Sequence, residues 1–181
     1  EEFLNKLHEI KDLLINDYQS LYLTELKDLI HKARIFGFYF ATLDVRQDSR
    51  IHHEVFTHII DSLIASGSGS LPANYNSLDE ASQIKILATL DADISADQFD
   101  NELVFKTLGS IEAIKKIQKN NGEKGANRYI ISNNQSALNV MQVFAMLKMT
   151  AFKKELTVDI VPLFETVDDL VNSAEIMESL Y

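Results

Sequence analysis

The sequence has no cysteine among its 181 residues, so disulfide bonds and thiolate chemistry are excluded. No apolar run reaches the roughly 18–20 residues that a membrane-spanning helix needs, and no signal-peptide pattern opens the chain. Basic residues are few: 17 lysines and arginines stand against 27 acidic residues, giving a formal charge of −10. Nonspecific nucleic-acid binding depends on dense basic patches. We therefore expect a soluble, cytoplasmic protein without a membrane or nucleic-acid partner.

Motifs that bind phosphate or activate a nucleophile are also missing. The glycine–serine stretch at 66–70 leads into a loop rather than into a helix fed by a strand, so it is not a P-loop. We interpret this stretch as an internal loop and not as a linker between domains. A chain of this length suits one domain with a sizeable core, or part of a larger one. We therefore treat residues 1–181 as a single domain.

Three of the five histidines, His52, His53 and His58, fall on one predicted helix together with Glu54. Glu54 and His58 have the i, i+4 spacing that can chelate zinc. The three histidines do not share one helix face, however, and no HExxH pattern accompanies them. We favour histidines at the surface, or histidines that support other residues, over a zinc site.

The most informative stretch is residues 156–170, where an apolar, β-branched run changes into a helical pattern. Residues 156–163 have the composition of a strand buried on both faces, which is typical of parallel sheets. Thr166 can cap the following helix, whose apolar face is formed by Val167, Leu170, Val171, Ala174, Met177 and Tyr181. Glu165 therefore lies where a strand gives way to a helix, at the sheet edge where ligands and catalytic groups gather.

Two other segments, residues 38–45 and 128–132, have strand composition and are also followed by helical patterns. The predicted helices are 1–19, 24–36 (capped by Thr24), 49–63, 80–90 (opened by a Ser77/Glu80 capping box), 96–119, 136–149 and 167–181. The helix at 136–149 is apolar nearly all round and should be largely buried. A helical part at 47–125 separates the first two strands. This order indicates a helix-rich α/β fold, either an open doubly wound sheet or a segment of a (β/α)8 barrel.

Arg46 directly follows the first predicted strand, as Glu165 follows the third. If the strands are parallel and adjacent, both side chains meet at one edge of the sheet. A guanidinium there suits a phosphate or a carboxylate, and a carboxylate suits Mg²⁺ or Mn²⁺. The residues alone favour a structural alternative, in which Arg46 pairs with Asp44 or Asp48 and Glu165 caps the following helix.

Three segments carry a resemblance: PLFET at 162–166 with DDL at 168–170, LDVRQDS at 43–49 with His52, and RYIIS at 128–132. They resemble the PLFET-x-DDL, L-D-I-R-Q-E-S-x-x-H and Y-V-I-S-M-A segments of phosphoenolpyruvate carboxylase. All three are at compatible spacings, and together they cover most of residues 37–181. The chain is similar to an internal fragment of a divergent bacterial-type member of that family.

The resemblance implies part of a (β/α)8 barrel with about three parallel strands, a large helical insertion, and apolar surface that a much longer parent chain covers. It also implies a Mg²⁺- or Mn²⁺-dependent carboxy-lyase that combines phosphoenolpyruvate with bicarbonate to give oxaloacetate and phosphate. By the same resemblance Arg46 contacts the substrate, and Glu165 is one of two carboxylate ligands of the metal. His52, Asp48 and Ser132 are candidates for supporting roles. The parent is expected to be a homotetramer.

The segments that carry the family's catalytic histidine, second metal carboxylate and catalytic lysine are absent from this sequence. We therefore assign no catalytic residue within the chain and expect the isolated fragment to be inactive. The chain also departs from the family pattern at Asn133, Asn134 and Asn139, with effects that the sequence leaves open.

A second hypothesis is a non-catalytic helical interaction or regulatory module of a larger protein. The two hypotheses differ in geometry. The enzyme requires Arg46, Ser132 and Glu165 at one edge of a parallel sheet with converging side chains. The module allows these groups to scatter.

Overall fold

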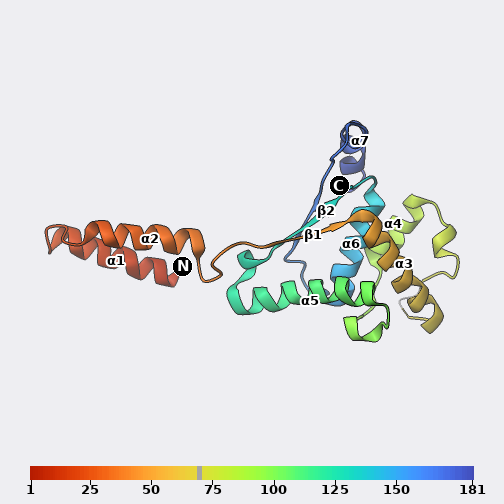
Figure 1. The fold of residues 1–181 in the computed structure, drawn as a ribbon, viewed down its shortest axis with the longest axis horizontal. Coiled ribbons are helices and arrows are strands. Elements are labelled where there is room, and N and C mark those ends of the chain that lie inside the picture. The colour runs from red at the N-terminus through yellow and green to blue at the C-terminus, as the bar shows by residue number, and fades with distance from the viewer. Residues whose placement is uncertain (69–70) are drawn as a thin grey trace. The chain divides into compact units, whose positions relative to one another are not determined.

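The computed structural model describes residues 1–68 and 71–181 (Figure 1). Contacts divide the chain into two compact units, Glu1–Thr42 and Leu43–Tyr181, where the sequence analysis treated it as one domain. How the segment is organised within a longer chain stays a prediction. The loop predicted at 66–70 lies partly outside the described residues, at 69–70.

The first unit is a hairpin of two helices, α1 (Glu2–Asn16) and α2 (Leu23–Phe36). Leu7 and Ile30 are buried, and Gly37 ends α2 with a positive φ of 52°, as its sequence position predicts. The predicted cap Thr24 is wrong, because α2 begins one residue earlier and Tyr22 occupies the N-cap position without a side-chain hydrogen bond. The chain enters α2 through a tight turn in which Tyr22 has a left-handed backbone, and this places Thr24 inside the first turn.

The second unit contains a three-stranded sheet of β1 (Asp44–Asp48), β2 (Arg128–Ser132) and β3 (Asp159–Pro162). The order is β1-β2-β3, and both pairings are parallel, as predicted. In the register, Arg46 lies beside Ile130, and Ile130 lies beside Val161. Successive residues of a strand point to opposite faces, so this row lies on the face opposite to the buried Tyr129.

The predicted start of the first strand at residue 38 is wrong, since β1 begins only at Asp44. Phe38 and Phe40, which suggested a strand, lie instead beside aromatic side chains of the helical hairpin, and both stay largely exposed. Phe38 lies 5.7 Å from Phe3, and Phe40 stacks on Phe36 at 5.8 Å, measured between ring centroids. Aromatic composition fits a strand and a helix-packing loop equally well, and here it belongs to the loop.

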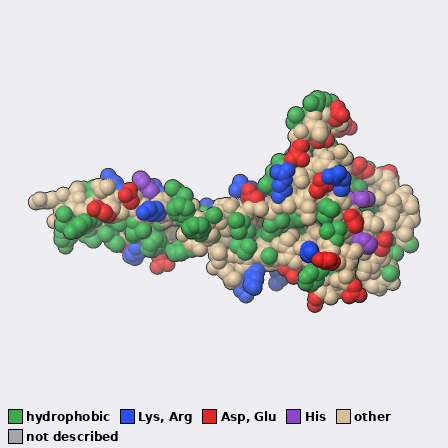
Figure 2. All heavy atoms as spheres, viewed as in Figure 1, with side chains coloured by type: hydrophobic (Ala, Val, Ile, Leu, Met, Phe, Trp, Pro, Cys, Tyr) green, Lys and Arg blue, Asp and Glu red, His purple; other side chains and the backbone are tan. Residues whose placement is uncertain are grey.

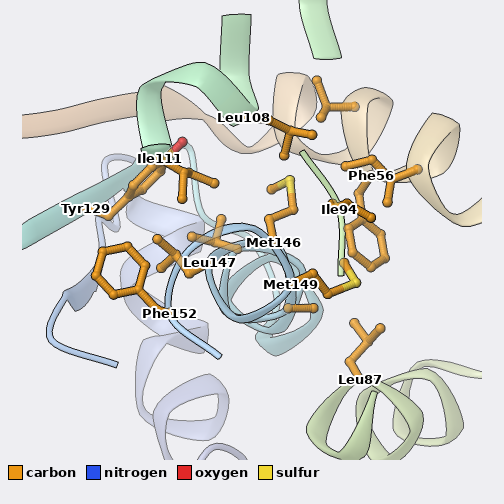
Figure 3. Close-up of a cluster of buried hydrophobic side chains, with 14 of the residues drawn as sticks. Phe56, Leu87, Ile94, Leu108, Ile111, Tyr129, Met146, Leu147, Met149 and Phe152 are labelled. Carbon is orange, nitrogen blue, oxygen red and sulfur yellow. The ribbon is translucent and has the colours of Figure 1, made fainter. Parts of the chain in front are cut away.

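Four helices belong to the same unit as the sheet: α3 (Ser49–Ser66), α4 (Glu80–Thr89), α5 (Glu102–Asn121) and α6 (Ala137–Thr150) (Figure 1). Of these, α3 contacts β1 and α6 contacts β3. Three of the four lie between β1 and β2, which confirms the predicted helical insertion. Helix α6 contacts α3, α4 and α5 and is buried nearly all round, as predicted. Figure 3 shows the core that surrounds it, with Met146 and Leu147 next to Ile111, Tyr129 and Phe152.

One predicted N-cap and one predicted helix start in the insertion are wrong. The capping box of Ser77 and Glu80 does not form, because Asp79 caps α4 through the N–H of Ser82, and Glu80 accepts from the N–H of Leu138. The helix predicted from residue 96 begins instead at Glu102, after a short 3₁₀ turn at Ala96–Gln98 and an N-cap at Asn101. Asp79 and Asn101 take the N-cap positions, which aspartate and asparagine fill about as readily as serine.

Helix α7 (Val167–Glu178) is capped by Thr166 as predicted, but its predicted inner face is exposed. Val167, Leu170 and Val171 are 76%, 60% and 74% exposed, and Ile176 is the apolar residue of α7 that is buried. Helical periodicity identifies an apolar face without saying what covers it. Exposed apolar side chains also run along the first unit (Figure 2), in keeping with the apolar surface expected of this segment.

The architecture is a helix-rich α/β fold built on a parallel sheet, which is consistent with part of a (β/α)8 barrel. The complete barrel stays an expectation, because three strands do not close one. In the described part of the chain, no helix combines the length and the apolar character needed to cross a membrane.

Candidate functional site at the carboxyl edge of the sheet

Three strand-to-helix turns lie together at the carboxyl edge of the sheet. The turn after β1 passes directly into α3 at Ser49, the turn after β2 leads to α6, and the turn after β3 leads to α7. Because the strands are parallel, all three turns meet at one edge, which is where open α/β sheets and barrels bind their ligands.

Arg46 and Glu165 meet at this edge. Nη2 of Arg46 donates to Oε1 of Glu165 at 2.6 Å, and the two side chains are 55% and 41% exposed. Arg46 is the middle residue of β1 rather than the residue after it. The predicted end of the first strand, at residue 45, was therefore wrong, because β1 continues to Asp48. The side chain of Arg46 still reaches across the sheet to the turn after β3. Two of the three side chains whose convergence the enzyme hypothesis requires, those of Arg46 and Glu165, therefore meet.

The structural alternative for Arg46 does not occur. Asp44 pairs with Arg128, whose Nε lies 3.0 Å from Oδ1 of the aspartate. Asp48 pairs with Arg50 through two hydrogen bonds of 2.9 and 2.8 Å and also caps α3. The hydrogen bonds from Arg50 lower the pKa of Asp48 to about 2. Asp48 therefore stays ionised as part of the α3 N-terminus, and its predicted support of the site stays a prediction.

Glu165 does not cap α7, in contrast to its structural alternative. Thr166 and Asp169 form a reciprocal capping box, and Oδ2 of Asp169 accepts from the N–H groups of both Glu165 and Thr166. The carboxylate of Glu165 instead points toward β2, where its Oε2 accepts from the N–H of Asn133 at 3.1 Å. Ser132, the last residue of β2, lies directly before this N–H donor. The predicted residues Arg46, Ser132 and Glu165 thus share one edge.

A single carboxylate such as Glu165 fits Mg²⁺, which is typically bound by one or two carboxylates together with water and substrate oxygens. Within residues 1–68 and 71–181, no group of three or more potential ligands surrounds a common point. A closed metal cage is therefore not built from the described residues. Glu165 by itself can supply one oxygen ligand to a cation.

His52 is fully buried on the helix-covered side of the sheet. Its Nε2 lies 3.1 Å from the hydroxyl oxygen of Tyr129, whose neighbour in register is Val45 rather than Arg46. Burial lowers the pKa of His52 to about 4, and the charge of Asp48 opposes this shift. Among the described residues, His52 makes no hydrogen bond to Arg46 or Asp48, and its predicted support of them stays a prediction.

The buried His52 should make folding sensitive to acid. A folded-state pKa of about 4 lies below the ordinary 6.5, so the unfolded chain takes up a proton first as the pH falls. The free energy of unfolding should therefore drop by up to about 3 kcal/mol between about pH 6.5 and pH 4. Urea unfolding of the chain at several pH values measures this. His52→Gln should flatten the curve, whereas His58→Gln, at an exposed position, should not; an unchanged slope in His52→Gln contradicts the assignment.

The three departures from the family pattern have different surroundings. Asn133 has a positive φ of 54°, a conformation that asparagine adopts more readily than most residues. Asn134 is completely buried, and its side-chain amide has no partner among the described residues. Asn139 accepts from the N–H of Gln135, which is a capping role at the start of α6.

Sequence reasoning missed the groups that hold Glu165 in place. Asp169 could have been found, since Thr166 and Asp169 have the spacing of a capping box. The backbone N–H of Asn133 and the hydroxyl of Ser49, which donates to the carbonyl oxygen of Asn133, have no sequence signal of this kind.

Comparison with known proteins adds to this geometry. A sequence profile described as phosphoenolpyruvate carboxylase matches residues 1–181. Phosphoenolpyruvate carboxylases of Burkholderia mallei (strain SAVP1) and Burkholderia pseudomallei (strain 668) are each 29% identical over 196 residues. These matches cover 100% of this chain but 19% of each relative, so the chain spans about a fifth of their length. The chain belongs to the phosphoenolpyruvate carboxylase family.

Proposed function

We propose that the full-length protein carboxylates phosphoenolpyruvate with bicarbonate to give oxaloacetate and phosphate, with Mg²⁺ or Mn²⁺ as cofactor. The observation that carries this proposal is the meeting of Arg46 and Glu165 at 2.6 Å, from positions 119 residues apart. A guanidinium and a carboxylate at the carboxyl edge of a parallel sheet suit an anionic substrate and its cation. A non-catalytic module has no need for this convergence.

Arg46 would bind the phosphate or carboxylate group of the substrate. The guanidinium is always charged and can donate two parallel hydrogen bonds to such a group. More than half of the Arg46 side chain is exposed, so an incoming anion can reach it. In the structure the guanidinium of Arg46 is paired with the carboxylate of Glu165, so the substrate has to displace this carboxylate from Arg46.

Glu165 would contribute one oxygen ligand to the cation. Its Oε2 is held by the N–H of Asn133, whereas Oε1 is held by the exposed guanidinium of Arg46. When Arg46 turns to the substrate, Oε1 loses its partner and becomes available. A bound divalent cation would supply Lewis-acid stabilisation of the negative charge that develops on the enolate oxygen.

Activity is expected only from the full-length protein. It should form oxaloacetate from phosphoenolpyruvate in a reaction that requires bicarbonate and stops when a chelator removes Mg²⁺. The isolated chain of 181 residues should form none, because the family's histidine and lysine segments are absent from it. Coupling to NADH oxidation by malate dehydrogenase measures both. If the isolated chain forms oxaloacetate, the expectation that it is inactive is refuted. If the full-length protein forms no bicarbonate-dependent product, the proposed function is refuted.

A further inference from the structure

The backbone of Asn133 connects the three turns of the site through its N–H and its carbonyl group. Its N–H donates to Oε2 of Glu165 in the turn after β3, at 3.1 Å. The hydroxyl of Ser49, at the start of α3, donates to the carbonyl oxygen of Asn133 at 2.5 Å. The turns after β1, β2 and β3 are therefore linked in series by hydrogen bonds, although Ser49 and Asn133 are 84 residues apart.

Ser49 is placed to hold the backbone of Asn133 rather than to meet a ligand. Ser49 is only 4% exposed. It directly follows Asp48, which is the last residue of β1 and the N-cap of α3. A buried hydroxyl without a partner is costly, so the bond to the carbonyl oxygen of Asn133 is strongly favoured. The carbonyl is thereby held toward α3, and the left-handed backbone of Asn133 helps to set where the N–H of the same residue points.

The two partners of Glu165 differ in how firmly they are held. Arg46 is a long, exposed side chain that a substrate can draw away. The N–H of Asn133 belongs to the backbone, and the carbonyl group of the same residue is held by Ser49. A hydrogen bond from a fixed N–H to a carboxylate is charge-assisted and directional, so it orients the carboxylate even after Arg46 leaves.

We propose that Ser49 and Asn133 are positioning residues that orient the Glu165 carboxylate for a divalent cation. The proposal rests on the proposed function, because it takes Glu165 to be a cation ligand. Neither residue touches the cation or the substrate. Their effect is to reduce the number of orientations that Glu165 samples before the cation binds, so their loss weakens cation binding.

Binding of Mn²⁺ to the full-length protein, followed through the electron paramagnetic resonance signal of the free ion, tests this without any turnover. Ser49→Ala should weaken Mn²⁺ affinity about 10-fold, the lower end of the effect of groups that orient metal ligands. Ser173→Ala is the matched control, because its hydroxyl also donates to a backbone carbonyl, that of Leu170, but on α7 away from the site. It should bind Mn²⁺ like the wild type.

A pair of variants at residue 133 tests the backbone itself. Asn133→Gly keeps the N–H and readily adopts a positive φ. Asn133→Ala also keeps the N–H but disfavours that backbone by about 1–2 kcal/mol, and it should bind Mn²⁺ more weakly than Asn133→Gly. If Ser49→Ala is too unstable to measure, this pair decides the question.

The outcomes separate this proposal from the function on which it rests. Wild-type Mn²⁺ affinity in Ser49→Ala, or equal affinities in the two Asn133 variants, overturns the positioning role. Glu165→Gln should weaken Mn²⁺ binding more than any of these variants. If Glu165→Gln binds Mn²⁺ like the wild type, the ligand role of Glu165 fails, and the positioning proposal fails with it.

Discussion

Replacement of Glu165 with glutamine should lower the kcat/KM of the full-length protein for phosphoenolpyruvate by about 10³-fold at limiting Mg²⁺. Stabilisation of developing charge by a bound cation contributes several kcal/mol, and each step of about 1.4 kcal/mol changes a rate tenfold. Glutamine keeps the size of the side chain and can still accept from the N–H of Asn133, but it carries no charge for the cation. Steady-state kinetics as a function of Mg²⁺ concentration measure the loss, which saturating Mg²⁺ should partly restore.

Loss of folding cannot explain such an effect. The ion pair between Glu165 and Arg46 is exposed, and pairs of this kind contribute about 0.2–1 kcal/mol to stability. Asp168→Asn provides the matched control, since it removes a carboxylate three residues away that is exposed on the first turn of α7. That variant should keep wild-type kinetics. Near-normal turnover of Glu165→Gln at limiting Mg²⁺ contradicts the ligand role.

Replacement of Arg46 with alanine should lower kcat/KM for phosphoenolpyruvate by about 10²-fold, because one hydrogen bond to a charged group contributes about 1.5–3 kcal/mol. Arg46→Lys should recover part of the loss, since lysine keeps the charge but cannot donate two parallel hydrogen bonds. The response to Mg²⁺ distinguishes this variant from Glu165→Gln. Saturating Mg²⁺ should not restore Arg46→Ala, because the missing group binds the substrate.

Arg128→Ala is the control for Arg46→Ala. Arg128 lies on the same face of the sheet and is also half-exposed and ion-paired, with Asp44, but it sits at the amino end of β2. A substrate at the carboxyl edge does not reach it, so Arg128→Ala should keep wild-type kinetics. Equal losses in the two variants indicate that the charge of the sheet face matters rather than the position of Arg46.

The site was predictable from sequence where one short stretch contains both a strand end and a helix start. Residues 156–166 predict a parallel strand, a cap at Thr166 and an acid between them, and the structure has β3, Glu165 and the Thr166 cap in this order. The predicted extent and burial of the strand are wrong, because β3 covers only Asp159–Pro162, with Asp159 exposed and the other three residues half-buried. The pairing of Glu165 with Arg46 could be expected only on the assumption that β1, β2 and β3 are parallel neighbours. The register confirms that assumption.

Other features depend on tertiary partners that the local sequence does not name. Phe38 and Phe40 have strand-like composition, but their partners Phe3 and Phe36 lie in the helical hairpin. The resemblance made His52 a candidate for supporting Arg46 or Asp48, but His52 lies beside Tyr129, which points to the face of the sheet opposite to Arg46. The hold of Asn133 on Glu165 is a backbone interaction, and side-chain types do not reveal it.

A crystal structure of the full-length protein with Mn²⁺ and phosphoenolpyruvate tests the central claim most directly. We predict an anomalous Mn²⁺ peak within coordination distance of the Glu165 carboxylate, with the Arg46 guanidinium hydrogen-bonded to the substrate and no longer to Glu165. A cation bound elsewhere, with the pair of Arg46 and Glu165 intact beside an occupied substrate site, would contradict it.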